Sequence, residues 1–416
     1  MPEPIRLLHF ADTHIGMENY GRISPNTGLS TRVEDFLRRM DEMIDYARAN
    51  DVDLTIFAGD AFKTRTPNPT YQREFAWRVR DLSEMAPLVL LVGNHDLPPM
   101  AKRASSVEIY DTLAVPNVWV ADKYETKVIE TKRGPVVVGA APYPIRARLL
   151  EDEETAGLTI AEIDARLQES LAHILDELAE QADQHAMPRV LTGHFTVEGA
   201  VAGSERQIML GRDISVARSW IADPRWDYVA LGHVHKHQNM TPKRDEMLPP
   251  VVYSGSIERI DFGEENDTKG FCWVELERDH VEWEFVPLNA RQFVTVRADL
   301  RESENPTQDA MDAIQERSLR DAVVRMIVQL TPEAEASYND LAIRDALRQS
   351  GASFIVPVKK EIQQTARARL GDSPEELDDV ELLNRYLISR QIDEARRNEL
   401  IETAKDIFEN TVIRRD

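Results

Sequence analysis

The sequence lacks both the cysteines of disulfide-bonded secreted proteins and the apolar runs of membrane proteins. Cys272 is the only cysteine among 416 residues, so no intrachain disulfide can form, and we expect it to be a core residue rather than a reactive thiol. The first apolar stretch, residues 5–10, follows no basic region or cleavage site, and no stretch is long and apolar enough to span a membrane. These absences predict a cytoplasmic protein without a membrane segment.

Basic charge is scarce as well. Lys and Arg number 50 against 73 Asp and Glu, which gives a formal net charge of -23. A protein that binds nucleic acid over a large surface of its own usually has the opposite balance. The charge therefore disfavours a nuclease that acts alone and favours one subunit of a complex, because metal ions neutralise the carboxylates that hold them and a basic partner can supply phosphate contacts.

The residues that are present alternate between strand-like and helix-like segments. Residues 5–11 and 54–58 are apolar and strand-like, and residues 31–50 and 70–85, which follow them, have apolar side chains at helical spacing. This alternation predicts an α/β core with ligands at the strand ends. Hydrophobic residues make up 42% and charged residues 30% of the chain, as in globular proteins, and the length predicts two or three domains.

Five of the strand-like segments end in side chains that can bind metal. They read FADTHIG, FAGD, VGNHD, LTGHF and LGHVH, with glycine beside the polar residue. Asp, Asn and His on loops above a sheet suit a site for two transition-metal ions. The predicted ligands are Asp12, His14, Asp60, Asn94, His194, His233 and His235.

The residue types also favour particular roles within such a site. Asp60 stands alone at its strand end, so it is the best candidate to bridge two ions, which a shared carboxylate holds roughly 3.5–4 Å apart. Mixed nitrogen and oxygen ligands with the amide of Asn94 favour manganese or iron over a structural zinc. His95 projects differently from Asn94, and we expect it to protonate a leaving oxygen or stabilise the phosphorus, with Asp96 orienting its ring.

Four basic residues flank the metal-binding loops. Their side chains could contact phosphates, or they could simply be solvated, and the sequence leaves both alternatives open. These residues are Arg22, Lys63, Arg65 and Arg259.

The pattern changes near residue 291. Residues 291–370 combine strand-like and helix-like segments without candidate ligands, as in a small α+β domain. Residues 371–416 contain two segments with an apolar stripe at helical spacing. Such stripes favour docking to a partner, although a helical hairpin folded back on the body is the alternative.

The motif set DTH, GD, GNHD, GHF and GHVH resembles that of the calcineurin-like metallophosphoesterases. Within that superfamily, the string YSGSIERIDFGEENDTKGF is similar to the SbcD-type nucleases of DNA double-strand-break repair. The resemblance is close over residues 5–290 and extends to the rest only in length and order. It implies a four-layer α/β sandwich in residues 1–290, a DNA-binding capping domain in 291–370 and helices in 371–416 that dock an SbcC-type coiled-coil ATPase.

The resemblance also implies a ligand set and an activity. One ion would be held by Asp12, His14, Asp60 and His235, and the other by Asp60, Asn94, His194 and His233. Two Mn²⁺ ions are implied, with Mg²⁺ or Fe²⁺ as further possibilities, together with a homodimer associated with the nucleoid. The implied activities are exonuclease cleavage of double-stranded DNA ends and endonuclease cleavage of single strands or hairpins.

One position departs from the family pattern. Many members have a histidine three residues after the bridging aspartate, and this chain has Lys63 there. A lysine can contact a phosphate as a point charge but cannot shuttle protons at neutral pH. The balance of exonuclease and endonuclease activity is therefore open.

Two other functions compete with the nuclease. The same core could act on a small phosphodiester or phosphomonoester, but such an enzyme needs neither a capping domain nor docking helices. The chain could also be an inactive scaffold for the ATPase, but a scaffold has no reason to keep a full set of buried ligands.

Overall fold

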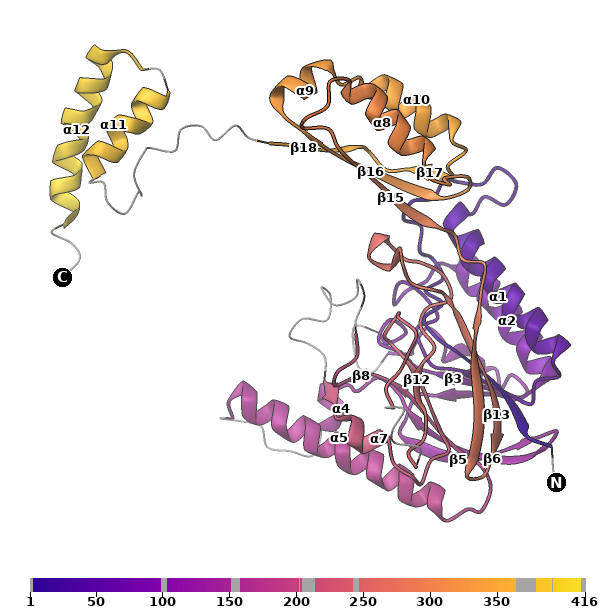
Figure 1. Cartoon of the computed structure of the whole chain (residues 1–416). Helices are drawn as coiled ribbons and strands as arrows, with labels where there is room; N and C mark the ends of the chain where they lie inside the picture. The colour runs from indigo at the N-terminus through magenta and orange to yellow at the C-terminus, as the bar shows by residue number, and fades with distance from the viewer. Residues whose placement is uncertain are drawn as a thin grey trace. The chain divides into compact units, whose positions relative to one another are not determined.

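The computed structural model in Figure 1 describes residues 3–98, 103–150, 158–201, 203, 214–241, 247–363, 379–390 and 392–412. The chain forms two compact units. The first comprises Met1–Arg297, Ala313–Met326 and Arg344–Val358, and the second comprises Ala298–Asp312, Ile327–Ile343 and Lys359–Asp416. Among the described residues, no helix is both long and apolar enough to cross a membrane.

The first six-stranded sheet contains three of the predicted ligand-bearing strands. Strands β1 to β4 run parallel, and β13 and β14 continue the sheet antiparallel beyond β1. Both faces of the central strands are covered, so their sequences, such as LTIF and LVLL, are continuously apolar. In sheet order the strands are β14 (His280–Pro287), β13 (Gly270–Glu277), β1 (Ile5–Phe10), β2 (Leu54–Phe57), β3 (Leu88–Leu91) and β4 (Val118–Ala121).

The second six-stranded sheet contains the other two predicted ligand-bearing strands, β7 and β10. Strands β6, β7, β10 and β12 are parallel, and antiparallel pairings add β5 and β11 at the edges. In sheet order the strands are β11 (Gln238–Asn239), β12 (Val251–Tyr253), β10 (Tyr228–Gly232), β7 (Arg189–His194), β6 (Gly134–Ala141) and β5 (Glu125–Thr131).

Helices cover the outer faces of both sheets (Figure 1). Helices α1 (Thr31–Ala49) and α2 (Pro69–Met85) pack on the first sheet, and α5 (Ile160–Asp183) packs on the second. Each begins at a residue whose side chain accepts a hydrogen bond from the first turn, namely Ser30, Asn68 and Thr159. A third apolar core, with Leu7 and Val138 among its members, joins the inner faces of the sheets. The expected α/β sandwich with four layers is confirmed.

Shorter elements connect these layers. They are α3 (Ile109–Thr112), α4 (Arg146–Leu149), β8 (Thr196–Val197), β9 (Ser215–Val216), α7 (Arg218–Ile221) and the 3-10 helix η1 (Phe262–Glu264).

The region after residue 291 is α+β, as the sequence predicted. Strands β15 (Phe293–Asp299), β16 (Val323–Leu330), β17 (Phe354–Ile355) and β18 (Lys359–Ile362) form one sheet, and the division between the two units falls within β15 and β16. The accompanying helices are α8 (Pro306–Gln315), α9 (Pro332–Ser337) and α10 (Asp340–Gln349). The domain boundaries at 290 and 370 remain predictions.

Two helices occupy the tail where helical spacing predicted them. They are α11 (Asp379–Ser389) and α12 (Glu394–Val412), and they contact each other. Residues 371–378, 391 and 413–416 of the predicted docking segment lie outside the described residues.

Candidate metal centre

The predicted ligand side chains come from the carboxyl ends of β1, β2, β3, β7 and β10. Asp12 and His14 follow β1, Asp60 follows β2, and Asn94 follows β3. His194 ends β7, and His233 and His235 follow β10. Because these strands are parallel within each of the two stacked sheets, their polar ends gather at one edge of the sandwich.

One group of ligand atoms is formed by Asp12, His14 and His235. One atom from each lies within 4.8 Å of the others, and all three residues are buried. The two Nε2 atoms of His14 and His235 are 3.0 Å apart. His14 Nε2 also lies 3.8 Å from Asp60 Oδ2, so this group includes the aspartate that the sequence predicts to be shared.

A second group surrounds the side-chain oxygen of Asn94. This Oδ1 atom is 3.1 Å from His194 Nε2 and 3.0 Å from His233 Nδ1. His194 Nε2 is in turn 3.4 Å from Asp60 Oδ2. Asp60 therefore lies between the two groups, and the structure brings all seven predicted ligands together.

The backbone is strained at four of these residues. Asp12, His14, Asp60 and His233 have φ angles of 53°, 39°, 63° and 89°, in the left-handed region that residues with side chains seldom adopt. Such conformations persist only where the surrounding structure enforces them, and they concentrate at functional sites. The loops therefore hold these side chains in place at a cost in backbone energy.

Glycine is required beside two of the ligands. Gly59 has a φ of 99°, and a Cβ atom there would lie 2.3 Å from His194 Nδ1. A Cβ atom on Gly93 would lie 2.2 Å from Asp60 Oδ1. The glycines of the FAGD and VGNHD segments thus leave room for ligands from other strands.

The bonding of the second group fits a bound cation. His194 Nδ1 lies 2.6 Å from the Ala58 carbonyl oxygen and donates to it, so the Nε2 atom of a neutral ring carries a lone pair. That lone pair faces two further acceptors, Asn94 Oδ1 and Asp60 Oδ2. With the ring neutral, three acceptors converge, and they need a positive charge that either a proton on His194 or a divalent ion with nitrogen and oxygen ligands supplies.

The electrostatics of the group support the same conclusion. Burial lowers the pKa of His194, but the Asp60 carboxylate outweighs burial and raises that pKa to about 9. Burial raises the pKa of Asp12 to about 6, while burial at His14 holds the pKa of that imidazole well below its usual value. Buried carboxylates and imidazoles in such a cluster compete for positive charge, which protons or metal ions can provide.

Comparison with known proteins agrees with this site. Residues 5–237, more than half of the chain, match the calcineurin-like phosphoesterase family. The chain belongs to that family.

Relatives of this phosphoesterase refine the comparison. The SbcD subunit of the nuclease SbcCD from Bacillus subtilis (strain 168) is 28% identical over 293 residues, which are 69% of this chain and 70% of that protein. The corresponding SbcD protein of Escherichia coli (strain K12) is 26% identical over 414 residues, which are 95% of this chain and 96% of that protein. The expected similarity to SbcD-type nucleases is confirmed.

A solved structure is also similar, though weakly. The dimetal phosphatase from Danio rerio aligns with 68% of this chain and 99% of its own, with a TM-score of 0.39 and 10% identity.

His95 lies beside the phosphoesterase ligands, but Asp96 does not orient its ring. His95 Nδ1 bonds to the Lys63 carbonyl oxygen at 2.9 Å, and the His95 amide donates to Asp60 Oδ1 at 2.8 Å. The Asp96 carboxylate instead accepts from the amides of Asp60, Ala61 and Gly93 and from the Ser106 hydroxyl. The expectation about Asp96 was wrong, because its buried oxygens are fully used by backbone donors and a hydroxyl.

Glu264 is a residue of the site that sequence reasoning missed. Its Oε1 atom lies 2.9 Å from His235 Nδ1, and its side chain is fully buried. Glu264 is the first of two adjacent glutamates in the string GEEND. Nothing local distinguishes it from Glu265, so only the fold identifies it.

The four basic candidates differ in their surroundings. Lys63 is half-buried and Arg65 is exposed, so both side chains remain candidates for phosphate contacts. Arg22 is exposed and donates to the Ser353 carbonyl oxygen. Arg259 is buried and donates to four carbonyl oxygens, those of Glu264, Asp267, Ala290 and Arg291, a geometry that favours a structural role over the expected phosphate contact.

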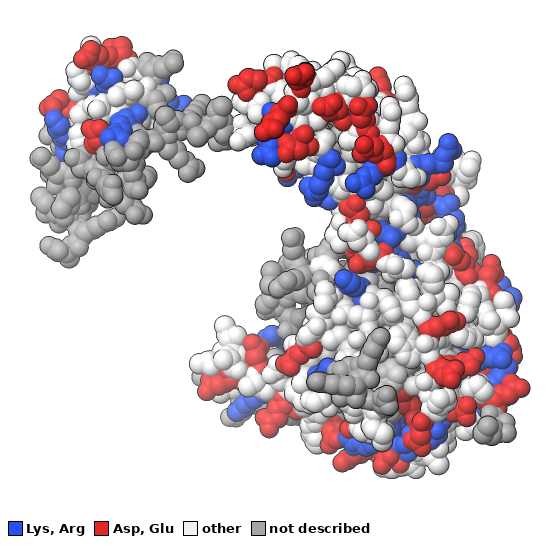
Figure 2. Space-filling model, viewed as in Figure 1, with Lys and Arg blue, Asp and Glu red and all other residues white. Residues whose placement is uncertain are grey.

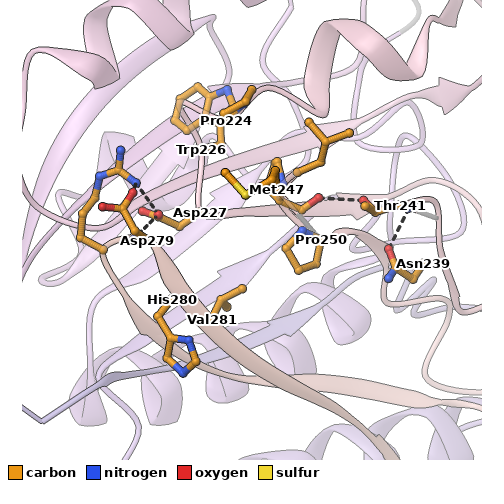
Figure 3. Close-up of a pocket in the computed structure, with 13 residues that line it drawn as sticks. Pro224, Trp226, Asp227, Asn239, Thr241, Met247, Pro250, Asp279, His280 and Val281 are labelled. Carbon is orange, nitrogen blue, oxygen red and sulfur yellow. Dashed lines mark hydrogen bonds and ion pairs between the residues drawn. The ribbon is translucent and has the colours of Figure 1, made fainter. Parts of the chain in front are cut away.

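A separate pocket of about 500 Å³ lies at the opposite edge of the second sheet (Figure 3). Trp226 and Asp227 precede β10 there, and Pro250 precedes β12. The Asp227 carboxylate is already bonded to Arg278 at 2.6 Å and to the Asp279 amide at 2.8 Å. The pocket is therefore at the amino ends of strands whose carboxyl ends bear the metal-binding residues, and its charged groups pair with one another.

Proposed function

We propose that this phosphoesterase is a metal-dependent DNA nuclease, the catalytic subunit of an end-processing and repair complex with an SbcC-type ATPase. The observation that carries the proposal is the convergence of seven metal-binding side chains around the shared Asp60. The similarity to the SbcD protein of the nuclease SbcCD over 95% of the chain supports DNA as the substrate.

The two groups of side chains correspond to two metal sites. Asp12, His14, Asp60 and His235 would hold one ion, and Asp60, Asn94, His194 and His233 the other. Two divalent ions held by these residues would supply polarisation of the phosphoryl oxygens and activation of water, so no serine or cysteine nucleophile would be required. We assign Mn²⁺ to both sites from the mixed nitrogen and oxygen ligands, with Mg²⁺ or Fe²⁺ as alternatives.

His95 is assigned to the leaving oxygen of the phosphodiester. Its Nδ1 proton is held by the Lys63 carbonyl oxygen, so Nε2 is the atom free to exchange a proton with the substrate. Burial lowers the pKa of His95, so the ring is neutral without substrate. An anionic phosphodiester beside it would favour the protonated ring that general-acid catalysis requires.

The substrate proposal covers double-stranded ends, hairpins and single strands. Lys63 and Arg65 follow Asp60 in the chain and are the basic side chains that we assign to the DNA backbone, with Arg22 as a weaker candidate. Figure 2 shows Lys and Arg interspersed with Asp and Glu over the displayed face of the first unit. With a net charge of -23, the chain would depend on a partner for much of its phosphate contact.

The partner proposal rests on the tail. We assign residues 371–416 to docking of the SbcC-type ATPase and residues 291–370 to a capping domain that contacts DNA. Tyr386 and Ile388 on α11 are 50% and 51% exposed, as expected for side chains that a partner covers. A homodimer in the cytoplasm, associated with the nucleoid, completes the proposal.

Cleavage assays with the purified chain test the function. A linear duplex, a single-stranded circle and bis-p-nitrophenyl phosphate would be incubated with Mn²⁺, with Mg²⁺ and with EDTA. Mn²⁺-dependent DNA cleavage that is lost in Asp60→Ala and kept in the control Glu169→Gln, on the exposed side of α5, is the expected result. Turnover of the small ester alone would replace the nuclease with a small-molecule phosphodiesterase, and inactivity even with the ATPase added would indicate a scaffold.

A further inference from the structure

A buried ion pair lies directly behind one of the proposed metal ligands. Glu264 Oε1 is 2.9 Å from His235 Nδ1, and Glu264 Oε2 is 2.9 Å from Lys269 Nζ. Oε2 also accepts a hydrogen bond from the Ile260 amide at 2.9 Å. The side chains of Glu264 and Lys269 are both 0% exposed, so the pair is shielded from solvent.

Lys269 holds the same histidine from its backbone side. In addition to its ion pair with Glu264, the Lys269 ammonium group donates to the His235 carbonyl oxygen at 3.1 Å and to Ser256 Oγ at 2.9 Å. All three N–H groups of the lysine thus have partners. The Glu264 carboxylate therefore bonds to the ring of His235, and Lys269, the counter-ion of Glu264, bonds to the backbone of the same histidine.

Hydrogen bonds from Arg259 hold the loop that carries Glu264. Arg259 Nε donates to the Glu264 carbonyl oxygen at 3.2 Å, and an Arg259 terminal nitrogen donates to the Asp267 carbonyl oxygen at 2.7 Å. These bonds tie down the segment between Glu264 and Lys269. The position of the Glu264 carboxylate beside His235 is therefore fixed by a loop that Arg259 holds in place.

Stability alone is a poor explanation for this pair. Burying two charges carries a large desolvation penalty for each ion, and well-packed apolar replacements are often equally stable or more stable. An ionised carboxylate can only accept hydrogen bonds, so its bond to His235 places the ring proton on Nδ1. The lone pair is then on Nε2, the atom that lies 3.0 Å from His14 Nε2 inside the first ligand group.

We propose that Glu264, with Lys269 as its buried counter-ion, is the positioning residue of His235. It fixes the ring orientation and the tautomer that presents Nε2 to a divalent cation, and its charge makes that nitrogen a stronger ligand. The inference rests on the proposed metal-dependent function, because His235 acts as a ligand only there.

Calorimetric titration of metal-free protein with Mn²⁺ tests the proposal without DNA. The wild type and the exposed control Glu304→Gln should each bind two ions. Glu264→Gln keeps the side-chain size but loses the charge, and it should weaken one of the two sites by roughly 10- to 100-fold while leaving the other unchanged. Wild-type affinity at both sites in Glu264→Gln would overturn the proposal.

A double-mutant cycle separates positioning from a general loss of structure. His235→Asn should weaken the same site, and adding Glu264→Gln to it should cause little further loss, because both changes act on one ligand. Additive losses would overturn the proposal. The double variant Glu264→Gln/Lys269→Met leaves no unpaired buried charge, so it should unfold near the wild-type temperature. It should still bind the affected Mn²⁺ ion weakly. Wild-type affinity at that site in the double variant would also contradict the proposal.

Metal titration and DNA cleavage together distinguish failure of the positioning role from failure of the proposed nuclease function. Protein that binds two Mn²⁺ ions with the expected Glu264 dependence but cleaves no DNA would overturn only the proposed function. Protein that cleaves DNA with both sites insensitive to Glu264→Gln would overturn only the positioning role.

Discussion

The carboxylate of Asp96 holds the backbone of Asp60, the aspartate shared by the two ligand groups. Asp96 Oδ2 accepts a hydrogen bond from the Asp60 amide at 2.9 Å, and Oδ1 accepts one from the Ala61 amide at 3.0 Å. Asp60 has a φ angle of 63°, so these two bonds are placed where the chain needs support against strain. Asp96 therefore acts on the site through Asp60 and not through His95.

Asp96→Asn should destabilise the protein and disturb both metal sites. An asparagine turns one acceptor atom into a donor that faces a backbone N–H, and each unsatisfied buried group costs about 1–3 kcal/mol. Urea unfolding should show the loss, and Mn²⁺ titration should show weaker binding at both sites because Asp60 belongs to both. Asp111→Asn on the exposed side of α3 is the control. Unchanged stability in Asp96→Asn would contradict the support role.

His95→Asn should reduce DNA cleavage without removing the metals. A positioned general acid contributes typically 10²- to 10⁴-fold to a rate, and we expect a loss in that range. His95 also lies within 4.8 Å of His14 and Asp60 in a possible ligand cluster, so Mn²⁺ titration of the variant decides its role. Two ions bound with reduced turnover fit the general acid, whereas loss of one ion would make His95 a ligand.

Removal of divalent ions should lower the thermal midpoint of unfolding. Buried carboxylate oxygens and imidazole nitrogens converge around Asp60, and bound cations would stabilise that arrangement in the folded state only. At a free Mn²⁺ concentration of 100 times the dissociation constant, each site should add about 2.7 kcal/mol of stability. Differential scanning calorimetry in EDTA and in Mn²⁺ measures the shift. Asp60→Ala should respond much less, and an equal response in that variant would argue against the shared carboxylate.

His9 should make the protein less stable in acid. Its ring is fully buried between the sheets and bonds to Tyr228 Oη at 3.1 Å and to the Leu231 carbonyl oxygen at 3.2 Å. Burial lowers the pKa of His9 from 6.5 to about 3. Above pH 6.5 the ring is neutral in both states, but between 6.5 and 3 only the unfolded chain takes up the proton, so stability falls with falling pH by about 1.4 kcal/mol per unit.

Comparison with His9→Gln isolates this effect. Other acidic and basic groups titrate in both proteins, so they cancel in the difference between the two free energies of unfolding, measured in EDTA. The advantage of the wild type over the variant should shrink as the pH falls from 6.5 to 4. A difference that stays constant over that range would show that His9 does not carry the predicted linkage.

Most of the fold and ligand set could be read from local patterns. The apolar runs before Asp12 and Asp60 predicted strands of an α/β core, and the spacing in residues 31–50 predicted the helix that covers them. Alternate residues of a strand face opposite sides, and β1 follows this rule. Leu8 packs toward the helices, whereas His9 bonds across to Tyr228 of the second sheet.

Contacts between distant segments were not predictable in the same way. Asp96 follows His95 directly, and adjacency favoured a bond between their side chains. In the folded chain the Asp96 carboxylate instead reaches the amides of Asp60 and Ala61, which are 36 and 35 positions away. Arg259 was a plausible phosphate contact by its position near the loops, and only the folded loop reveals the carbonyl groups that surround its guanidinium.

The sequence by itself determined which side chains could bind metal and that they lie at the ends of strands, because strand periodicity and ligand chemistry are local properties. The tertiary structure alone decided how these side chains group around Asp60 and which residues hold them. Glu264 reaches His235 across 29 positions, and Lys269 completes the buried pair. Such contacts depend on the packing of two sheets and on the path of a loop between them, and neither is encoded in the spacing of neighbouring residues.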